Sequence, residues 1–147
     1  MKRIIIQEDA CMGCGLCEVY CVVQHSTSKD LLKAYKKERP RPISRVRVEE
    51  AIPLSFAVQC QHCEDPPCVE ACLSGAMQLD ADTRLVVHDT EKCMGCWTCI
   101  AVCPYGALRM DADAKVVVKC DLCPTLDTPA CVANCPNEAL VYKEVCF

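Results

Sequence analysis

The fold is decided by one stretch in the second half of the chain, Cys93-Met94-Gly95-Cys96-Trp97-Thr98-Cys99-Ile100-Ala101-Val102-Cys103-Pro104. Its four cysteines are separated by two, two and three residues, and a proline follows the last one. The same spacing, after the same Cys-Met-Gly-Cys start, occurs near the N-terminus at Cys11, Cys14, Cys17 and Cys21. This is the spacing with which thiolates bind [4Fe–4S] clusters. Both stretches therefore predict iron–sulfur ligation.

Two further groups of four cysteines each have one widened gap. They are Cys60-x2-Cys63-x4-Cys68-x3-Cys72 and Cys120-x2-Cys123-x7-Cys131-x3-Cys135. Each widened gap contains prolines, which indicates a stiffened loop. Sixteen of the 17 cysteines thus form four groups of four, and a cubane cluster takes four thiolates, so the chain can hold four cubanes. The remaining cysteine, Cys146, has no companion nearby, and we expect a free thiol there.

Zinc and disulfides are weaker explanations of the cysteines. A zinc ion takes four ligands, commonly from two C-x2-C pairs, and does not need a third cysteine two residues after such a pair. Four groups of four cysteines therefore argue against zinc. A disulfide framework expects an even number of cysteines and a secretory leader, whereas the total is odd and the first residues are too polar for a leader. We therefore expect the reducing cytoplasm, where thiols stay free for metal. No run approaches the roughly 18 apolar residues of a membrane span, so direct membrane insertion is not expected.

The composition indicates an interior filled partly by inorganic clusters. The chain has 147 residues, enough for one domain or two very small ones. Apolar residues make up 52% of it, but cysteine inflates that figure, and there are only two Phe and one Trp. We infer that the clusters replace part of a conventional core and that the chain does not fold without its metal.

Positive charge is concentrated in one segment. The net charge is −4, yet half of all Lys and Arg lie between Lys29 and Arg47. This segment is either a solvated helix followed by a loop, or a docking patch for an acidic partner surface. Nucleic acid is not expected as a partner, because no aromatic platform or recognition motif accompanies the charge. The excess acid elsewhere should help to hold cluster potentials low.

An internal repeat predicts two β-hairpins. Residues 75–87 and 106–118 each contain a short apolar run, an Asp-Ala-Asp turn and a β-branched run. The other expected strands are Arg3–Gln7, Arg45–Glu49, Ser55–Gln59 and Ala139–Lys143. We expect the last cysteine of each group to lie on a short helix, at Leu16–Val23, Pro67–Leu73, Trp97–Val102 and Pro129–Asn134. A further helix is expected near Lys29–Lys37.

The remaining candidate side chains are given no chemical role. His62 lies inside a cysteine group that is complete without it, and His25 and His88 have no evident constellation. Trp97 and Tyr105 are expected to pack against a cluster or the core. No catalytic motif is present, and sixteen cysteine ligands leave no iron open to a substrate, so the chain is not expected to be an enzyme.

On these motifs, and on the stretch Lys119-Cys120-Asp121-Leu122-Cys123 with Asp127-Thr128-Pro129-Ala130-Cys131-Val132, the chain resembles four-cluster ferredoxin-like electron-transfer subunits. These serve formate dehydrogenases, molybdopterin reductases and hydrogenases. It looks most like the iron–sulfur subunit of carbon monoxide dehydrogenase, with tungsten aldehyde oxidoreductase small subunits as the nearest rival. The resemblance implies an α+β fold of two dicluster ferredoxin-like units, the inner inserted into the outer, with short helices and β-hairpins around four cubanes. The outer unit would comprise residues 1–25 and 116–147, the basic insertion 26–52, and the inner unit 53–115.

The resemblance also implies how the cysteines are shared. Three cysteines of one group and the last cysteine of another would hold each cluster. The four sets would be Cys11, Cys14, Cys17 and Cys135; Cys120, Cys123, Cys131 and Cys21; Cys60, Cys63, Cys68 and Cys103; and Cys93, Cys96, Cys99 and Cys72.

The function implied is a relay of single electrons. Four [4Fe–4S] clusters would connect a catalytic oxidoreductase subunit with an acceptor such as a flavin-dependent NAD(P) oxidoreductase or a hydrogenase, within a hetero-oligomer. The catalytic partner would be of the carbon monoxide dehydrogenase, aldehyde oxidoreductase, formate dehydrogenase or hydrogenase type. The alternative is a small polyferredoxin subunit that scaffolds an oligomeric or filamentous tungsten aldehyde oxidoreductase complex. A redox-responsive regulator is disfavoured, because no helix-turn-helix pattern is evident.

Overall fold

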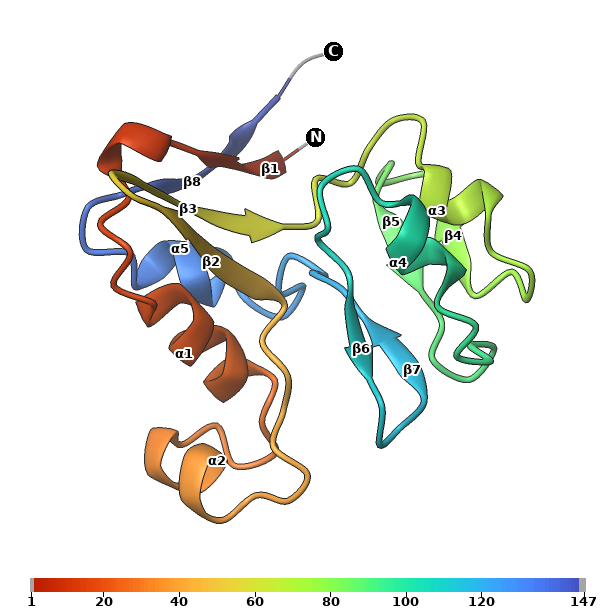
Figure 1. Cartoon of the computed structure of the whole chain (residues 1–147), viewed down its shortest axis with the longest axis horizontal. Coiled ribbons are helices and arrows are strands. Elements are labelled where there is room, and N and C mark those ends of the chain that lie inside the picture. The colour runs from red at the N-terminus through yellow and green to blue at the C-terminus, as the bar shows by residue number, and fades with distance from the viewer. Residues whose placement is uncertain (1, 146–147) are drawn as a thin grey trace.

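The computed structural model describes residues 2–145, and its elements gather in two groups (Figure 1). Cys146 lies outside the described residues. The strands are β1 (Lys2–Ile6), β2 (Val46–Ala51), β3 (Leu54–Gln59), β4 (Met77–Leu79), β5 (Val86–His88), β6 (Arg109–Asp111), β7 (Val116–Val118) and β8 (Leu140–Glu144). The helices are α1 (Leu16–Gln24), α2 (Leu31–Lys36), α3 (Pro67–Glu70), α4 (Thr98–Val102) and α5 (Ala130–Ala133), with a 3-10 turn, η1, at Glu8–Ala10.

The strands form antiparallel pairs, and one pair joins the two ends of the chain. Within residues 2–145 the pairs are β1 with β8, β2 with β3, β4 with β5, and β6 with β7. Ile4 on β1 lies opposite Tyr142 on β8. Elements from the beginning and end of the chain therefore make up one group with β2 and β3, while the middle of the chain makes up the other (Figure 1). The fold is small and α+β, with few helices and short hairpins.

The two expected hairpins are confirmed, and an aspartate builds each turn. The Asp80 carboxylate accepts hydrogen bonds from the backbone N–H groups of Asp82 at 3.2 Å and Thr83 at 2.7 Å. Asp111 does the same in the second hairpin, with the N–H groups of Asp113 at 3.1 Å and Ala114 at 2.9 Å. Asx turns of this kind satisfy backbone donors that the strands leave free. The repeated Asp-Ala-Asp sequence thus produces a repeated structure.

The cysteine helices are shorter than the sequence predicts. Only Cys21 among the last cysteines lies inside its helix; Cys72, Cys103 and Cys135 lie beyond theirs. Pro104 gives the physical reason in the third group, because a residue before proline is pushed out of the helical region. Cys103 accordingly has φ −71° and ψ 114°, an extended conformation. The prediction that every last cysteine sits on a helix is wrong, and the helices carry the third cysteines instead.

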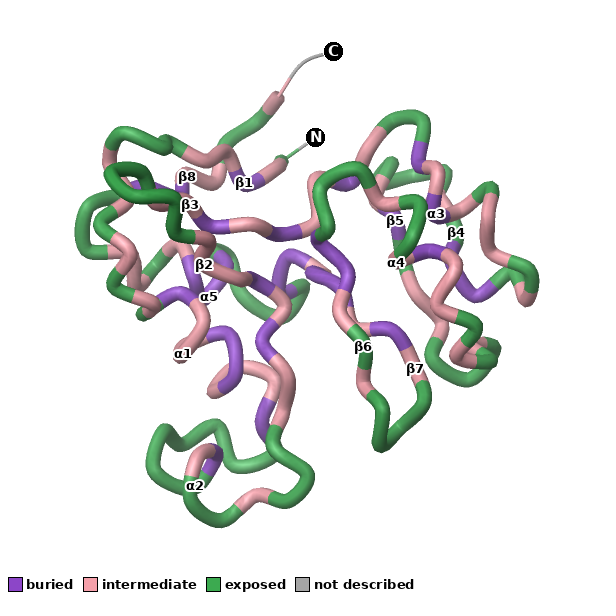
Figure 2. Tube along the Cα trace, in the orientation of Figure 1, coloured by how far each residue is buried: buried purple, intermediate pink, exposed green. Residues whose placement is uncertain are grey.

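Cysteines are part of both hydrophobic cores. In the first core, Cys17, Cys21, Cys120 and Cys131 are buried among aliphatic residues such as Ile4 and Leu140. In the second, Cys68 and Cys99 are buried among Met77, Val86 and Leu108. Figure 2 shows the buried residues along the inner side of each group, whereas the loop around α2 is largely exposed. The thiols therefore occupy positions that aliphatic side chains hold in most small domains.

No helix in residues 2–145 has the length and apolar character to cross a bilayer.

Candidate metal centres

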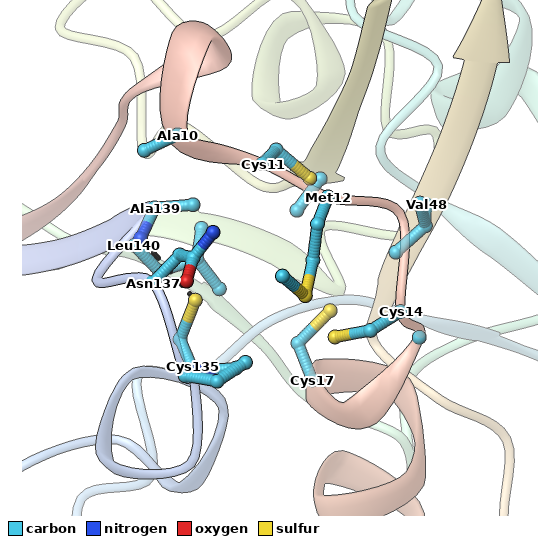
Figure 3. A pocket seen from close by; sticks show the side chains of 13 residues that line it. Ala10, Cys11, Met12, Cys14, Cys17, Val48, Cys135, Asn137, Ala139 and Leu140 are labelled. Atoms are coloured by element: carbon cyan, nitrogen blue, oxygen red, sulfur yellow. Dashed lines mark hydrogen bonds between the residues drawn. The ribbon is translucent and has the colours of Figure 1, made fainter.

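The first site joins the N-terminal cysteine group to the C-terminal one. Cys11, Cys14, Cys17 and Cys135 line a cavity of about 350 Å³. In Figure 3 their side chains approach one another from the loop before α1, from the first turn of α1, which carries Cys17, and from the segment after α5. Leu140, Val48 and the methyl groups of alanines complete the wall. Four thiols around an apolar cavity form a donor set suited to a [4Fe–4S] cluster.

Two further cavities have the same composition. Cys60, Cys63, Cys68 and Cys103 line one of about 340 Å³. Cys72, Cys93, Cys96 and Cys99 line one of about 290 Å³. In each, three cysteines come from one group and the fourth from another, as in the first site. The similar size and chemistry of the three cavities fit the same kind of inorganic group.

The fourth set is buried in the protein. Cys21, Cys120, Cys123 and Cys131 are each at most 8% exposed. Burial chiefly, and then the neighbouring Cys120, Cys21 and Cys123, raises the pKa of the Cys131 thiol well above its usual range. Cys21, Cys120 and Cys131 share the first hydrophobic core, so these thiols lie close together. With Cys123, they are the four predicted cysteines that line none of the three cavities.

The sets follow one another in space. Cys17 of the first set shares a hydrophobic core with Cys21, Cys120 and Cys131 of the buried set. Cys60, of the set completed by Cys103, packs against the same core. Cys68 and Cys99, from the two middle groups, share the second core. The four sets therefore lie in a row, with the set that contains Cys11 at one end and the set that contains Cys96 at the other.

Backbone N–H groups point at several of the sulfur atoms. The N–H of Arg45 donates to Cys21 Sγ at 3.2 Å, that of Met77 to Cys72 Sγ at 3.4 Å, and that of Ala139 to Cys135 Sγ at 3.2 Å. Such bonds stabilise thiolate sulfur and raise the reduction potential of a cluster bound to it. These three bonds go to the last cysteine of a group, and a fourth, from the N–H of Leu122 at 3.5 Å, goes to Cys120, the first cysteine of its group.

A charged network surrounds the fourth set. Asp121 forms ion pairs with His25, at 3.3 Å, and with Arg45, and it accepts the N–H of Cys123 at 3.1 Å. His25 Nδ1 also donates to the carbonyl oxygen of Cys21 at 2.8 Å. Burial opposes the charge on His25, but the hydrogen bonds to Asp121 and to Cys21 together outweigh burial and raise the pKa of His25 to about 9. Asp121 thus ties the Cys120 loop to helix α1.

A second buried network connects the middle of the chain to the last cysteine group. His62 Nδ1 accepts the N–H of Val86 at 3.2 Å, and the Val86 carbonyl accepts from Lys119 Nζ at 2.6 Å. Lys119 Nζ also donates to the carbonyl of Cys120 at 2.7 Å. Burial, together with the charges of Lys119 and Arg3, lowers the pKa of His62 to about 3, so the imidazole is neutral.

The other side chains singled out in the sequence have varied surroundings. His62 is a buried hydrogen-bonding residue rather than a member of a thiol set, whereas His88 and Trp97 line the Cys93 cavity. Tyr105 lines the Cys60 cavity. Sequence reasoning gave no role to Lys119 and Asp121. The sequence did contain a signal, because a charged residue stands on each side of Cys120. Charged residues are seldom buried unless they are paired, so charges beside a buried thiol suggest specific partners.

Comparison with known proteins identifies the family. A family model described as a 4Fe-4S dicluster domain matches residues 52–145. The chain belongs to this 4Fe-4S dicluster family. Its cofactor is therefore the [4Fe–4S] cluster, as the cysteine spacing predicts.

Two relatives are named for electron transport or transfer, and a third is named as a polyferredoxin-like subunit. Electron transport protein HydN of Escherichia coli K12 is 37% identical, over 96% of this chain and 87% of HydN. The polyferredoxin-like subunit of an aliphatic sulfonate oxidoreductase from Pyrococcus furiosus is 38% identical, over 90% of this chain and 70% of that one. The thiosulfate reductase electron transfer subunit PhsB of Salmonella typhi is 32% identical, over 92% of this chain and 71% of PhsB. The chain is an iron–sulfur electron-transfer protein of the kind found in oxidoreductase systems.

A solved structure shares the fold. The BamBC active-site complex of benzoyl coenzyme A reductase, with 1,5-dienoyl-CoA, contains a chain that matches with a TM-score of 0.52 and 25% identity, over 99% of this chain and 78% of that one.

Proposed function

We propose that the chain is a four-cluster electron relay, itself without catalytic activity, between a catalytic oxidoreductase subunit and a second redox protein. One observation carries the proposal: sixteen thiols lie in four sets of four, and three of the sets surround apolar cavities of similar size. In this proposal each set binds one [4Fe–4S] cluster through the sixteen cysteines that the sequence motifs supply. The clusters supply one-electron redox chemistry when bound, and the protein sets their spacing and potentials.

The exposure of the thiols supports a relay with two ends. Cys14 and Cys96 are exposed, and each belongs to a terminal set. The Cys120 set between them is buried throughout. Electrons would therefore enter and leave at the two terminal clusters and cross the interior through the middle ones. The pairing of β1 with β8 also supports two nested dicluster units, an outer one of residues 1–25 and 116–147 and an inner one of residues 53–115.

For the partners, we propose a catalytic subunit of the carbon monoxide dehydrogenase, aldehyde oxidoreductase, formate dehydrogenase or hydrogenase type, and a flavin- or NAD(P)-linked acceptor. The relatives from sulfonate and thiosulfate systems support a subunit role in a hetero-oligomer. A cytoplasmic location belongs to the same proposal, because a reducing compartment keeps sixteen thiols available for iron.

The test is anaerobic iron and sulfide analysis combined with a redox titration. The proposal expects about 16 iron and about 16 sulfide per chain, and low-potential clusters that each take one electron. A cluster-loaded protein that saturates at about 8 iron, or that has only positive potentials, would overturn it.

A second candidate function is the scaffold of an oligomeric or filamentous tungsten aldehyde oxidoreductase complex. It is favoured by the 38% identity to a polyferredoxin-like subunit. The mass of the purified, cluster-loaded chain discriminates between the two functions: self-association into large species favours the scaffold, and a discrete monomer favours the relay.

A further inference from the structure

Lys119 is a cation buried between two of the thiol sets. The residue is only 5% exposed. Its Nζ donates to the Val86 carbonyl at 2.6 Å and to the Cys120 carbonyl at 2.7 Å. Val86 lines the cavity of Cys60, Cys63, Cys68 and Cys103, and Cys120 belongs to the set completed by Cys21. The ammonium group is therefore one peptide carbonyl away from each of two neighbouring sets.

Within residues 2–145, no carboxylate pairs with this charge. Among the described residues, Lys119 takes part in no ion pair, and the nearby Asp121 is committed to His25 and Arg45. His62, which accepts the N–H of the same Val86, is neutral and adds no negative charge. A buried, unpaired ammonium is costly, because the low dielectric of the interior does not replace the lost hydration. Some other negative group must offset that cost.

The two central sets adjoin each other at Lys119. Cys60 packs against the core that contains Cys120. Val86, whose carbonyl binds Lys119 Nζ, shares the second core with Cys68 of the Cys60 set. Because Nζ also binds the carbonyl of Cys120 in the buried set, the charge of Lys119 lies between the two central sets.

We propose that the Lys119 ammonium is the shared counterion of the two central clusters and raises the reduction potential of both. This rests on the proposed function, in which each thiol set binds a cluster. A cluster with four thiolate ligands is anionic and gains further negative charge on reduction, so a nearby fixed cation favours its reduced form. A charge shared by both clusters shifts both potentials in the same direction. It thus eases entry of an electron into the central pair and leaves the transfer between the two nearly balanced.

The experiment compares four substitutions in the cluster-loaded full chain by redox titration with EPR detection. Lys119→Met removes the charge and the donor, Lys119→Gln keeps a donor without charge, and Lys119→Arg keeps the charge. Lys115→Met is the matched control, because Lys115 is exposed although its backbone lies against the Cys93 loop. The proposal expects two of the four potentials to fall in the Met and Gln variants. It expects no fall in the Arg variant or in the control.

Two results would overturn the counterion role. One is a Lys119→Gln protein that keeps all clusters at wild-type potentials, which would make Lys119 a hydrogen-bond donor only. The other is a Lys119→Arg protein that loses clusters as readily as Lys119→Met, which would make the residue a packing element. If the Met and Gln variants lose clusters and the Arg variant retains them, the charge is required for binding, which supports the role. A wild-type chain with fewer than four clusters would contradict the proposed function instead.

Discussion

The loops Cys11–Cys17 and Cys93–Cys99 are nearly the same loop in two different settings. Gly13 and Gly95 both have φ +69°. The residue before each helix is also left-handed, with φ 72° at Gly15 and 61° at Trp97. The cysteine spacing and the Cys-Met-Gly-Cys start therefore produce one backbone conformation, whatever surrounds it.

The surroundings differ in what touches each loop. A Cβ on Gly13 would meet side chains, with Glu50 Oε1 at 3.2 Å and Ser55 Oγ at 3.3 Å. A Cβ on Gly95 would lie 2.5 Å from the backbone carbonyl oxygen of Lys115. The side chains of Glu50 and Ser55 can shift to make room for a Cβ, whereas the backbone of Lys115 is held in the hairpin of β6 and β7. The comparison teaches that the motif determines the loop, and that the neighbouring elements determine how much change the loop tolerates.

The following helices differ as well. Helix α1 continues through Cys21 because Val22 is compatible with helical backbone. Helix α4 ends before Cys103 because Pro104 disfavours the helical conformation at the residue before it. In these two groups the residue after the last cysteine distinguishes a cysteine on a helix from one in an extended segment, although Cys72 lies beyond its helix without a following proline. In both cases the cysteine reaches a thiol set made by another group.

The largest expected effect is the loss of a thiol at matched positions in the two loops. Cys14→Ala and Cys96→Ala should each remove one cluster, so that iron falls from about 16 to about 12 per chain. The measurement is anaerobic iron analysis with EPR. Equal losses would show that the loops are equivalent in ligation, whereas an unchanged iron content in either variant would remove that cysteine from the proposed ligands.

The next effect concerns the residue after the last cysteine. Val22→Pro places proline inside α1 and should cost about 3 kcal/mol or more of unfolding free energy, because it removes a helical hydrogen bond and clashes with the preceding turn. The reciprocal Pro104→Val should change the unfolding free energy by less than about 1 kcal/mol, since the extended Cys103 remains accessible without proline. Thermal loss of the cluster absorption measures both. Equal destabilisation of the two variants would contradict this account.

A graded series of effects, from about 3 down to about 1 kcal/mol, is expected at the glycines. Gly95→Ala should cost about 3 kcal/mol, from left-handed strain and the clash with Lys115. Gly13→Ala should cost about 2 kcal/mol, because its neighbours are side chains that can shift. Gly15→Ala should cost about 1 kcal/mol, since its Cβ would meet nothing within 4 Å.

The same thermal measurement ranks the three variants. The order Gly95, Gly13, Gly15 is the test, and Gly15→Asn provides a control because asparagine tolerates the left-handed region better than alanine. A larger loss at Gly15 than at Gly95 would show that strain rather than contact governs these loops.

Local sequence predicted the local structure well. The Asp-Ala-Asp turns gave the hairpins at Asp80 and Asp111, and β-branched runs gave the strands within a residue or two of their observed ends. The cysteine spacing predicted the [4Fe–4S] cofactor, which the family match bears out. These features depend on neighbours in the chain, which a sequence pattern records.

Contacts between residues far apart in the chain could not be predicted from the sequence. Nothing near Lys119 in the chain indicates that its ammonium will reach Val86, 33 residues away in sequence. The ion pairs of Asp121 likewise depend on His25 and Arg45, which only the folded chain brings close. Among the basic residues of 29–47, Arg45 and Arg47 pair with carboxylates of the chain itself, so this segment is partly tied to the protein. The sequence does not identify the partner of the proposed relay, because recognition also depends on the surface of that other protein.

The pairing of β1 with β8 has a consequence for biosynthesis. The cavity of Cys11, Cys14 and Cys17 is completed by Cys135, more than a hundred residues later in the chain. A ribosome delivers the N-terminus first, so this site stays open until Cys135 has been made. The cavities bounded by Cys60 to Cys103 can close earlier. In the proposed relay, the first cysteine group would therefore wait longest for its fourth ligand, and a cluster could be completed there only after the synthesis of Cys135.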